Sequence, residues 1–284
     1  MTARLLRGAP VAKALSEGLR TRVDALAARG VTPTLAVVRV GERPDDLAYE
    51  RGALRRCEGV GVATRSLVLP ADVSQEVLLG TIRDVSADDA VHGCLLLRPL
   101  PAHLDEDAAC AALDPAKDVD GVTDASLCGV FSGREVGFPP CTAEAVLAVL
   151  DHYGCELEGA RVVVVGRSLV IGRPVAMMLL ARNATVTMCH TRTVDLEGEL
   201  RRADVVVAAA GHAGAVRAGA LRTGQVVIDV GINWDEGSGS LVGDVDPAAE
   251  GVVGAITPVP GGVGSVTTAV LAAHVVEAAE RSCR

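Results

Sequence analysis

Apolar positions along the chain follow two alternating patterns, short buried runs of strand length and longer segments with helical spacing. In the first half, residues 34–41 and 91–101 form apolar runs of strand length. Helical spacing of apolar residues is present at 11–30 and 47–61, and it also surrounds 77–85. Buried runs that alternate with helices indicate a parallel sheet with helices on its faces.

The second half shows the same alternation after the sequence Pro-Pro-Cys-Thr at 139–142. Thr142 is a candidate N-cap for the helix that follows it. A surface turn or hairpin is expected at 234–244, and the last helix, 265–282, is expected to pack on the first unit. Between these segments we expect strands at 160–166, 184–190, 204–211 and 225–231, and helices at 143–154, 172–183 and 194–203.

Chain length and composition favour two modest domains. The 284 residues exceed what one small core uses, and 49% of them are apolar. The expected fold class is α/β, with two domains that each contain a mainly parallel sheet flanked by helices. We expect the first domain at 1–139 plus 266–284, and a Rossmann-like dinucleotide-binding domain at 140–265.

Charge and cysteine content narrow the classes of function. The net charge of −9 argues against a general nucleic-acid binder, although it leaves room for a local basic pocket. No apolar run reaches membrane-spanning length, and the eight cysteines contain no CxxC pair and follow no signal peptide. We therefore expect a cytoplasmic protein with reduced thiols, no membrane contact and no metal site.

A turn of the kind that binds nucleotides lies at 162–174, with the sequence VVVVGRSLVIGRP. The expected strand is followed by Gly166, Arg167 and Ser168, and the next helix is expected to begin at Gly172. This order places backbone N–H groups and a helix N-terminus where a phosphate can bind. The spacing is not GxGxxG, so an ordinary strand-to-helix turn remains the alternative.

The end of the next strand favours NADP over NAD. It carries no carboxylate at its tip to accept from a ribose hydroxyl, although Asp195 follows. Arg167 and Arg192 are suited to pair with a 2′-phosphate, and Thr191 can donate a hydrogen bond. A solvated surface charge is the alternative for Arg192, and His190 is expected to be structural.

A rigid loop near the C-terminus, ITPVPGGVGSVT at 256–267, also indicates a binding site. Its glycines let the backbone approach a ligand closely, and its prolines hold that approach stiff. Together with the nucleotide-type turn, it indicates a cleft in which a cofactor meets a second molecule. The residues concerned are Pro258, Pro260, Gly261, Gly262 and Gly264.

Jointly, these motifs resemble one family, the methylenetetrahydrofolate dehydrogenase/cyclohydrolases. The matching strings occur in the family's order and cover nearly the whole chain. The resemblance implies two domains with a cleft between them, a homodimer, a role in one-carbon metabolism, and folate and NADP as ligands. The strings are PTLAVVRVG (33–41), the helix at 49–61, PAKDVDG (115–121), PPCT (139–142), VVVVGRSLVIGRP (162–174), ATVTMCHTRT (184–193), VVIDVGIN (226–233), GDVD (243–246) and ITPVPGGVG (256–264).

The resemblance also implies which residues bind. It places folate against Tyr49, Asp120 and the loop formed by Pro260, Gly261, Gly262, Val263 and Gly264. Asp120 would accept hydrogen bonds from adjacent pterin N–H groups, and Tyr49 would lie along the substrate's ring system. Apart from the resemblance, Asp120 reads as a turn-capping residue of the sequence KDVDG. NADP is placed on Gly166, Arg167, Ser168, Thr191 and Ile232.

The sequence departs from the family's pattern at its catalytic positions. The family's lysine, four residues after the tyrosine, corresponds to Ala53, and the family's glutamine corresponds to Leu97. A milder change places Ser265 where the family has proline. Arg56 and Arg98 lie nearby in sequence, but a guanidinium stays protonated and cannot act as a base.

These departures predict a dehydrogenase that has lost most or all of the cyclohydrolase activity. Hydride transfer needs orientation and proximity, whereas hydrolysis of the methenyl cation needs a group that takes and returns a proton. Two alternatives remain open. One is a repurposed folate-dependent enzyme of a specialised pathway, and the other is a folate- and NADP-binding protein without turnover.

Overall fold

The structure is a computed structural model that describes residues 2–237 and 239–283. The chain forms two compact units: unit 1 is Met1–Ala12 with Thr142–Thr267, and unit 2 is Lys13–Cys141 with Thr268–Arg284. This division lies close to the expected boundaries near 140 and 266. It differs in the first twelve residues, which belong with the dinucleotide-type unit because their strand pairs within its sheet.

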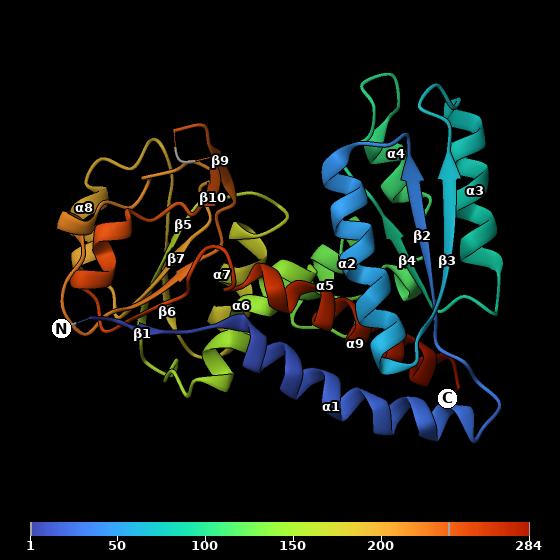
Figure 1. Cartoon of the computed structure of the whole chain (residues 1–284), viewed down its shortest axis with the longest axis horizontal. Helices are drawn as coiled ribbons and strands as arrows, with labels where there is room; N and C mark the ends of the chain where they lie inside the picture. The colour runs from blue at the N-terminus through green and yellow to red at the C-terminus, as the bar shows by residue number, and fades with distance from the viewer. Residues whose placement is uncertain (1, 238, 284) are drawn as a thin grey trace. The chain divides into compact units, whose positions relative to one another are not determined.

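Unit 2 contains a parallel sheet in which β2 (Thr34–Val40) lies between β3 (Ala63–Leu69) and β4 (Gly93–Leu96), as Figure 1 shows. All residues of β2 are buried, which explains why the apolar run at 34–41 predicted a strand. β3 was not predicted. It is an edge strand with the mostly exposed sequence ATRSLVL, so it lacks the apolar signal of a central strand.

The helices of unit 2 follow local sequence signals. α2 (Pro44–Val60) begins with a proline and ends at Gly61, whose φ of 85° is left-handed. α3 (Gln75–Ala87) has Ser74 as its N-cap, and the Ser74 hydroxyl accepts from the N–H of Val77 at 3.4 Å. The remaining helices lie wholly in unit 2 or have most of their residues there: α1 (Gly8–Ala27), α4 (Glu106–Ala111), η1 (Pro115–Lys117), α5 (Asp124–Ser132) and α9 (Gly264–Ser282).

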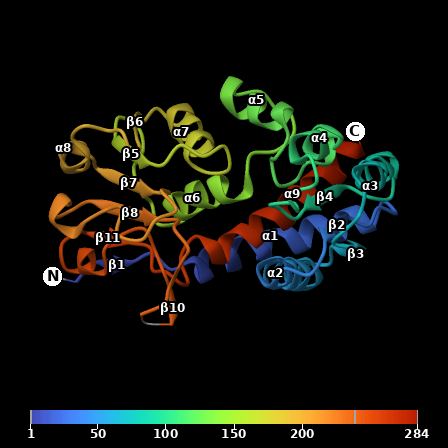
Figure 2. The same cartoon turned by 90° about the horizontal axis from the view of Figure 1, so that it is seen from above.

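Unit 1 contains a parallel sheet whose strand order is β6-β5-β7-β8-β11-β1, which can be followed in Figure 2. Its valine-rich central strands are buried, and their side chains fill the core of the unit. The expected strands are confirmed, whereas β1 and β11 were missed because each is only two residues long. The strands are β1 (Arg4–Leu5), β5 (Arg161–Val165), β6 (Thr185–Cys189), β7 (Val205–Ala208), β8 (Val226–Asp229) and β11 (Ala255–Ile256).

Helices and a hairpin complete unit 1. The expected hairpin is confirmed, because β9 (Asn233–Asp235) pairs antiparallel with β10 (Ser240–Val242). The predicted N-cap role of Thr142 is wrong: α6 (Cys141–His152) already begins one residue earlier, directly after Pro140. The other helices are α7 (Gly172–Ala181), α8 (Leu196–Arg202), η2 (Ala218–Ala220) and η3 (Pro247–Gly251).

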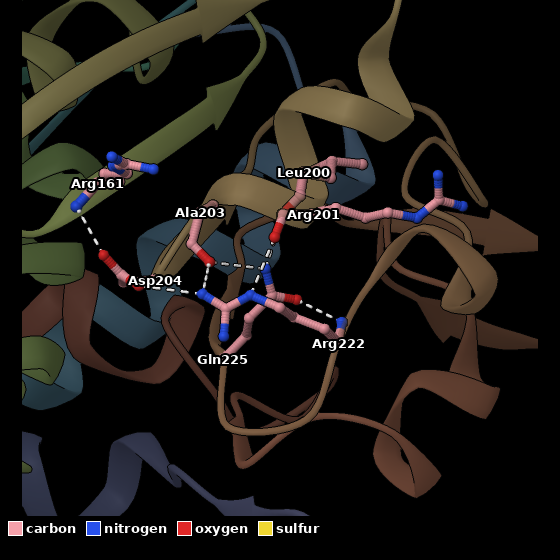
Figure 3. A network of polar contacts seen from close by, with 7 residues as sticks. All are labelled: Arg161, Leu200, Arg201, Ala203, Asp204, Arg222 and Gln225. Atoms are coloured by element: carbon pink, nitrogen blue, oxygen red, sulfur yellow. Dashed lines mark hydrogen bonds and ion pairs between the residues drawn. The ribbon is translucent and has the colours of Figure 1, made fainter.

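A polar network around the buried side chain of Gln225 holds the amino ends of the strands in unit 1 (Figure 3). Gln225, which is fully buried, donates from Nε2 to the carbonyls of Leu200 at 2.6 Å and Ala203 at 2.8 Å. Its Oε1 accepts from the N–H of Arg222 at 2.7 Å, and Arg222 reaches the carboxylate of Asp204 at 3.0 Å. At this end of the sheet, the polar side chain of Gln225 is therefore satisfied by backbone groups of the protein.

Within the described ranges, residues 2–237 and 239–283, each helix is too short or too polar to cross a lipid bilayer.

Candidate active site

The predicted nucleotide turn lies at the carboxyl edge of the unit 1 sheet, where the strand order reverses. β5 lies between β6 and β7: the chain passes from β5 to β6 on one side and then crosses back to β7 on the other side. Open parallel sheets take their ligands at such a switch point, outside the carboxyl ends of the strands. Gly166 is the first residue after β5 and therefore lies there.

Two glycines let this turn pack closely. Gly166 has a φ of +125°, and a Cβ at this position would overlap the carbonyl oxygen of Ala209. A Cβ at Gly172 would in turn overlap the carbonyl of Gly166. The N–H of Gly166 donates to the carbonyl of Cys189 at 2.9 Å, which ties the ends of β5 and β6 together. The narrow turn leaves backbone rather than side chains at the edge, as a diphosphate site requires.

Ser168 closes the first turn of α7. Its hydroxyl accepts from the N–H of Ile171 at 3.1 Å and of Gly172 at 3.4 Å, and its carbonyl accepts from Arg173 at 3.0 Å. Ser168 thus has a local capping role that an ordinary turn would also give it. Arg167, beside it, is exposed.

The end of β6 presents exposed donors and lacks an available acid. Thr191 and Arg192 are both exposed. His190 has a structural role, because its Nδ1 accepts from the N–H of Arg192 at 3.1 Å. Asp195 caps α8 by accepting from the N–H of Gly198 at 2.9 Å. Its carboxylate is therefore engaged in capping the helix, while Arg192 places an exposed positive charge near this strand end.

A fully buried carboxylate, Asp244, organises the loops after β7 and β8. It accepts from three successive backbone N–H groups, those of Ala210 at 2.6 Å, Gly211 at 2.9 Å and His212 at 2.9 Å. It also accepts from the side-chain amide of Asn233 at 2.9 Å. One side chain therefore fixes two neighbouring loops at the carboxyl edge of the sheet.

A second buried carboxylate, Asp229, supports the first. It accepts from the N–H groups of Gly231 at 3.0 Å, Asp244 at 2.9 Å and Val245 at 3.0 Å. Burial raises the pKa of Asp229 to about 6, although these hydrogen bonds lower it. Ile232, one of the expected cofactor residues, follows Gly231 and is 64% exposed. The strings VVIDVGIN, which contains Asp229, and GDVD, which contains Asp244, matched the family without giving these aspartates a role.

The glycine-rich loop near the C-terminus is shaped by its own backbone. Gly261 has a φ of +100°, and its carbonyl accepts from the N–H of Gly8 at 2.9 Å. A Cβ on Gly262 would lie 2.5 Å from the carbonyl oxygen of Pro258. Ser265 donates its hydroxyl to the carbonyl of Gly262 at 2.8 Å. Packing alone therefore requires some of these glycines.

Val263 is buried in unit 1, whereas Pro260, Gly261 and Gly264 are exposed. The loop thus presents backbone and a proline ring at its surface, while one valine anchors it. The expected cofactor residues and this loop belong to unit 1, and the other expected folate residues belong to unit 2.

In unit 2, the structure brings Tyr49 and Asp120 together. Tyr49 lies on α2 and is half-buried, and Asp120 is half-buried in the turn after η1. Burial raises the pKa of Tyr49 well above its usual value, and the charge of Asp120 raises it further. Burial also raises the pKa of Asp120 to about 6, against a hydrogen bond from Cys141 and the charge of Arg98.

Asp118, and not Asp120, caps the turn in KDVDG. The Asp118 carboxylate is fully buried and accepts from the N–H groups of Val122 at 2.9 Å and Thr123 at 2.8 Å. It also accepts from the hydroxyl of Ser126 at 2.6 Å. The turn-capping alternative for this segment therefore applies to the earlier aspartate.

Comparison with known proteins covers both units. Residues 6–120 match the family model described as tetrahydrofolate dehydrogenase/cyclohydrolase, catalytic domain, and residues 140–283 match its NAD(P)-binding domain. The bifunctional protein FolD of Clostridioides difficile is 49% identical over 275 residues, 96% of each chain. The chain belongs to the tetrahydrofolate dehydrogenase/cyclohydrolase family.

Solved structures of this family share the fold. The bifunctional methylenetetrahydrofolate dehydrogenase/cyclohydrolase of Campylobacter jejuni is 38% identical, with a TM-score of 0.95 over 98% of this chain and 99% of that one. The Trypanosoma brucei enzyme, solved with NADP and an inhibitor, is 37% identical, with a TM-score of 0.93 over 100% and 99%. The prediction of a two-domain α/β dehydrogenase of one-carbon metabolism that uses NADP is confirmed.

Within this family framework, Ala53 and Leu97 are both apolar and buried, with exposed fractions of 0% and 5%. Ala53 lies one turn after Tyr49 on α2, where the two share a helix face. The nearby arginines are engaged elsewhere. Arg56 donates to the hydroxyl of Ser16 at 3.1 Å, and Arg98 pairs with Glu106 at 3.1 Å.

Proposed function

We propose that this chain oxidises 5,10-methylenetetrahydrofolate to 5,10-methenyltetrahydrofolate with NADP, and that its cyclohydrolase activity is lost or much reduced. The observation that carries the second half is the pair of buried apolar residues, Ala53 and Leu97, on the catalytic positions. By the resemblance, bifunctional members of the family have a lysine and a glutamine at these two positions, where this chain has alanine and leucine.

Unit 1 holds the dinucleotide. Gly166 gives a side-chain-free approach for the diphosphate at the switch point of the sheet. Arg167 and Arg192 pair with the 2′-phosphate, and the Thr191 hydroxyl donates to it. Ile232 presents an exposed apolar side chain toward the cofactor. When bound, the nicotinamide supplies the acceptor for a hydride from the one-carbon bridge.

Unit 2 holds the pterin. The Asp120 carboxylate accepts from adjacent N–H groups of the ring, and Tyr49 lies along the ring system and adds a hydroxyl. In unit 1, the loop at 260–264 exposes Pro260, Gly261 and Gly264, which the resemblance assigns to folate. Burial raises the pKa of Asp120, but only to about 6. Its carboxylate is therefore still mostly ionised at neutral pH and can accept both hydrogen bonds.

The two reactions make different demands on side chains. In the oxidation, the folate nitrogens stabilise the product cation, so the protein supplies mainly orientation. In the hydrolysis, a group must remove a proton from water and later return one to nitrogen. Ala53 has no titratable atom, Leu97 has no polar atom to orient one, and the guanidinium groups of Arg56 and Arg98 are donors and not acceptors of hydrogen bonds.

The proposal is tested by assaying the purified protein with methenyltetrahydrofolate, beside its NADP-linked oxidation of methylenetetrahydrofolate. Loss of general acid–base catalysis removes about 10² to 10⁴ in rate, so hydrolysis should be slower than that of an ordinary bifunctional enzyme of the family by a factor in this range. Hydrolysis at the rate of such a bifunctional enzyme would refute the proposed loss. Failure to reduce NADP at all would instead favour the protein without turnover.

A reconstructed site makes the test sharper. Ala53→Lys combined with Leu97→Gln should raise the hydrolysis rate by roughly tenfold or more, because it returns a group that can carry a proton. Ala53→Met with the same second change is the matched control, since methionine has similar length and no titratable atom. A gain of equal size in both variants would show that the lysine's proton chemistry is not what is missing.

The resemblance also supports a homodimer and a cytoplasmic location. Sedimentation of the purified chain would test the first, and fractionation of the producing cells the second.

A further inference from the structure

Unit 2 contains a buried thiol and a buried imidazole that the proposed reaction does not use. Cys141 is 1% exposed and begins α6, while His274 is 2% exposed and lies on α9. They are 133 residues apart in sequence, yet the Cys141 sulfur lies 3.6 Å from the His274 Nδ1. In the sequence motif PPCT, Thr142 was considered as an N-cap, but Cys141 had no role assigned to it.

Both side chains donate to one carbonyl oxygen, that of Val119. The Cys141 thiol donates to it at 3.1 Å, and the His274 Nδ1 lies 2.8 Å from it. Because a carbonyl only accepts, the proton of the His274 ring must be on Nδ1. The ring is held by Phe138, with centroids 5.0 Å apart. Two donors from two helices therefore converge on one acceptor.

That carbonyl belongs to the peptide bond that joins Val119 to Asp120. Because the peptide group is planar, fixing its oxygen fixes the direction in which the chain enters Asp120. Asp118 holds the segment on the other side through the N–H groups of Val122 and Thr123. Gly121 has a φ of +67°, and a Cβ there would overlap the backbone of Pro140. The backbone on both sides of Asp120 is thus immobilised.

The same two side chains favour the ionised form of Asp120. Burial has the largest effect and raises the pKa of Asp120, whereas Cys141 and His274 each lower it; the one S–H proton of Cys141 is shared between the Val119 carbonyl and the Asp120 carboxylate. The titratable and charged groups that act on Asp120 or interact with it are Cys141, Arg98, Asp118, His274 and Tyr49.

We propose that Cys141 and His274 are positioning residues for Asp120, which they orient through the Val119 carbonyl. Neither side chain touches folate; they act by setting the direction and charge of the carboxylate that does. This inference rests on the proposed function, in which Asp120 binds the pterin ring. It predicts a defect confined to the folate side of the reaction.

The test compares variants that remove a donor with variants that keep one. His274→Leu removes the ring N–H, and His274→Asn restores an amide donor at a similar distance along the side chain. Cys141→Ala and Cys141→Ser form the same pair for the thiol. His92→Leu is the matched control, because His92 is a second buried histidine of unit 2 whose Nδ1 accepts from Thr34 instead.

We expect His274→Leu and Cys141→Ala to raise the KM for methylenetetrahydrofolate by about tenfold each, with the KM for NADP unchanged within about twofold. The acid limb of kcat/KM for folate should move to higher pH, because an influence that lowers the pKa of Asp120 is removed. His274→Asn and Cys141→Ser should recover most of both effects. His92→Leu should lower the unfolding midpoint without changing the KM for methylenetetrahydrofolate or the acid limb of kcat/KM.

Asp120→Asn, measured in parallel, separates the two levels of the claim. If it leaves folate binding intact, the proposed folate site is wrong. If it impairs folate binding while the donor-deleted variants keep the wild-type KM and acid limb, the positioning role is wrong. Equal defects in donor-deleted and donor-retaining variants would also overturn it. Should His274→Leu fail to fold, the Cys141 pair decides.

Discussion

Ala53 and Leu97 illustrate how one of two activities can depend on two side chains. A methyl group and an isobutyl group neither hold nor move a proton, while Tyr49, one helical turn before Ala53, and Asp120 keep the groups that bind a pterin. Under the proposed function, binding and hydride transfer are thereby separated from hydrolysis, because the two transition states need different stabilisation.

The sequence predicted which residues share a helix face, because this depends on local spacing. It did not predict which side chains from distant segments contact one another. Tyr49 and Ala53 were placed correctly on one helix face because they are four residues apart. No spacing rule links Cys141 to His274, or Asp244 to the loop at Ala210. Such pairs exist only after the strands and helices have packed.

The choice of NADP can be tested at Arg167 and Arg192. Each substitution to alanine should raise the KM for NADP by roughly tenfold and leave the KM for NAD nearly unchanged, because only NADP carries the 2′-phosphate. The measurement is a pair of steady-state titrations with the two dinucleotides.

Arg161→Ala is the control, since it removes the same charge at the amino end of β5. If Arg161→Ala weakens NADP as much as the other two, the effect is one of overall charge. If neither Arg167→Ala nor Arg192→Ala changes the preference, the 2′-phosphate lies elsewhere.

At the level of elements, the two edges of the unit 1 sheet have different roles. Gln225 closes the amino ends of the strands through backbone carbonyls of the loop at 200–203. Asp244 fixes the loops at the carboxyl ends, where Gly166 and Ile232 lie. Elements with strong apolar runs were predicted from sequence, whereas β3 was missed because an exposed edge strand has no such run.

This division predicts different consequences for two fully buried polar residues. Asp244→Ala and Gln225→Ala should each lower the free energy of unfolding by about 2–4 kcal/mol, because each leaves buried backbone groups without a partner. Only Asp244→Ala should also raise the KM for NADP, by roughly tenfold, since it loosens the cofactor loops. Urea unfolding and NADP titration give the two quantities.

If Gln225→Ala weakens NADP as much as Asp244→Ala does, then loss of stability alone explains both, and the carboxylate has no particular role in the cofactor loops.

At the level of the whole chain, the fold class and the order of the motifs were predictable from sequence, because family strings span nearly all of it. The assignment of the first twelve residues was not, since β1 is two residues long and joins the unit 1 sheet through β11. Each unit carries chemistry of its own, a dinucleotide turn in unit 1 and the Tyr49–Asp120 pair in unit 2.

Stability should depend on pH through Asp229. Burial raises its pKa from 3.8 to about 6, so the folded protein holds this proton more tightly than the unfolded chain. The stabilising contribution is complete below the unfolded pKa and is lost as the pH rises through the folded one. The free energy of unfolding of the wild type, relative to Asp229→Asn, should therefore fall between about pH 4 and pH 7. Urea unfolding across this range would contradict the assignment if the difference grew with pH.

The most direct measurement follows both products of one reaction. The purified protein is given methylenetetrahydrofolate and NADP, and NADPH, methenyltetrahydrofolate and 10-formyltetrahydrofolate are quantified from the first seconds. We expect one methenyltetrahydrofolate to accumulate for each NADPH formed, with 10-formyltetrahydrofolate appearing only at the rate of spontaneous hydrolysis. If 10-formyltetrahydrofolate instead keeps pace with NADPH and no methenyl intermediate builds up, the chain hydrolyses the cation without the lysine, and the proposed loss of activity is wrong.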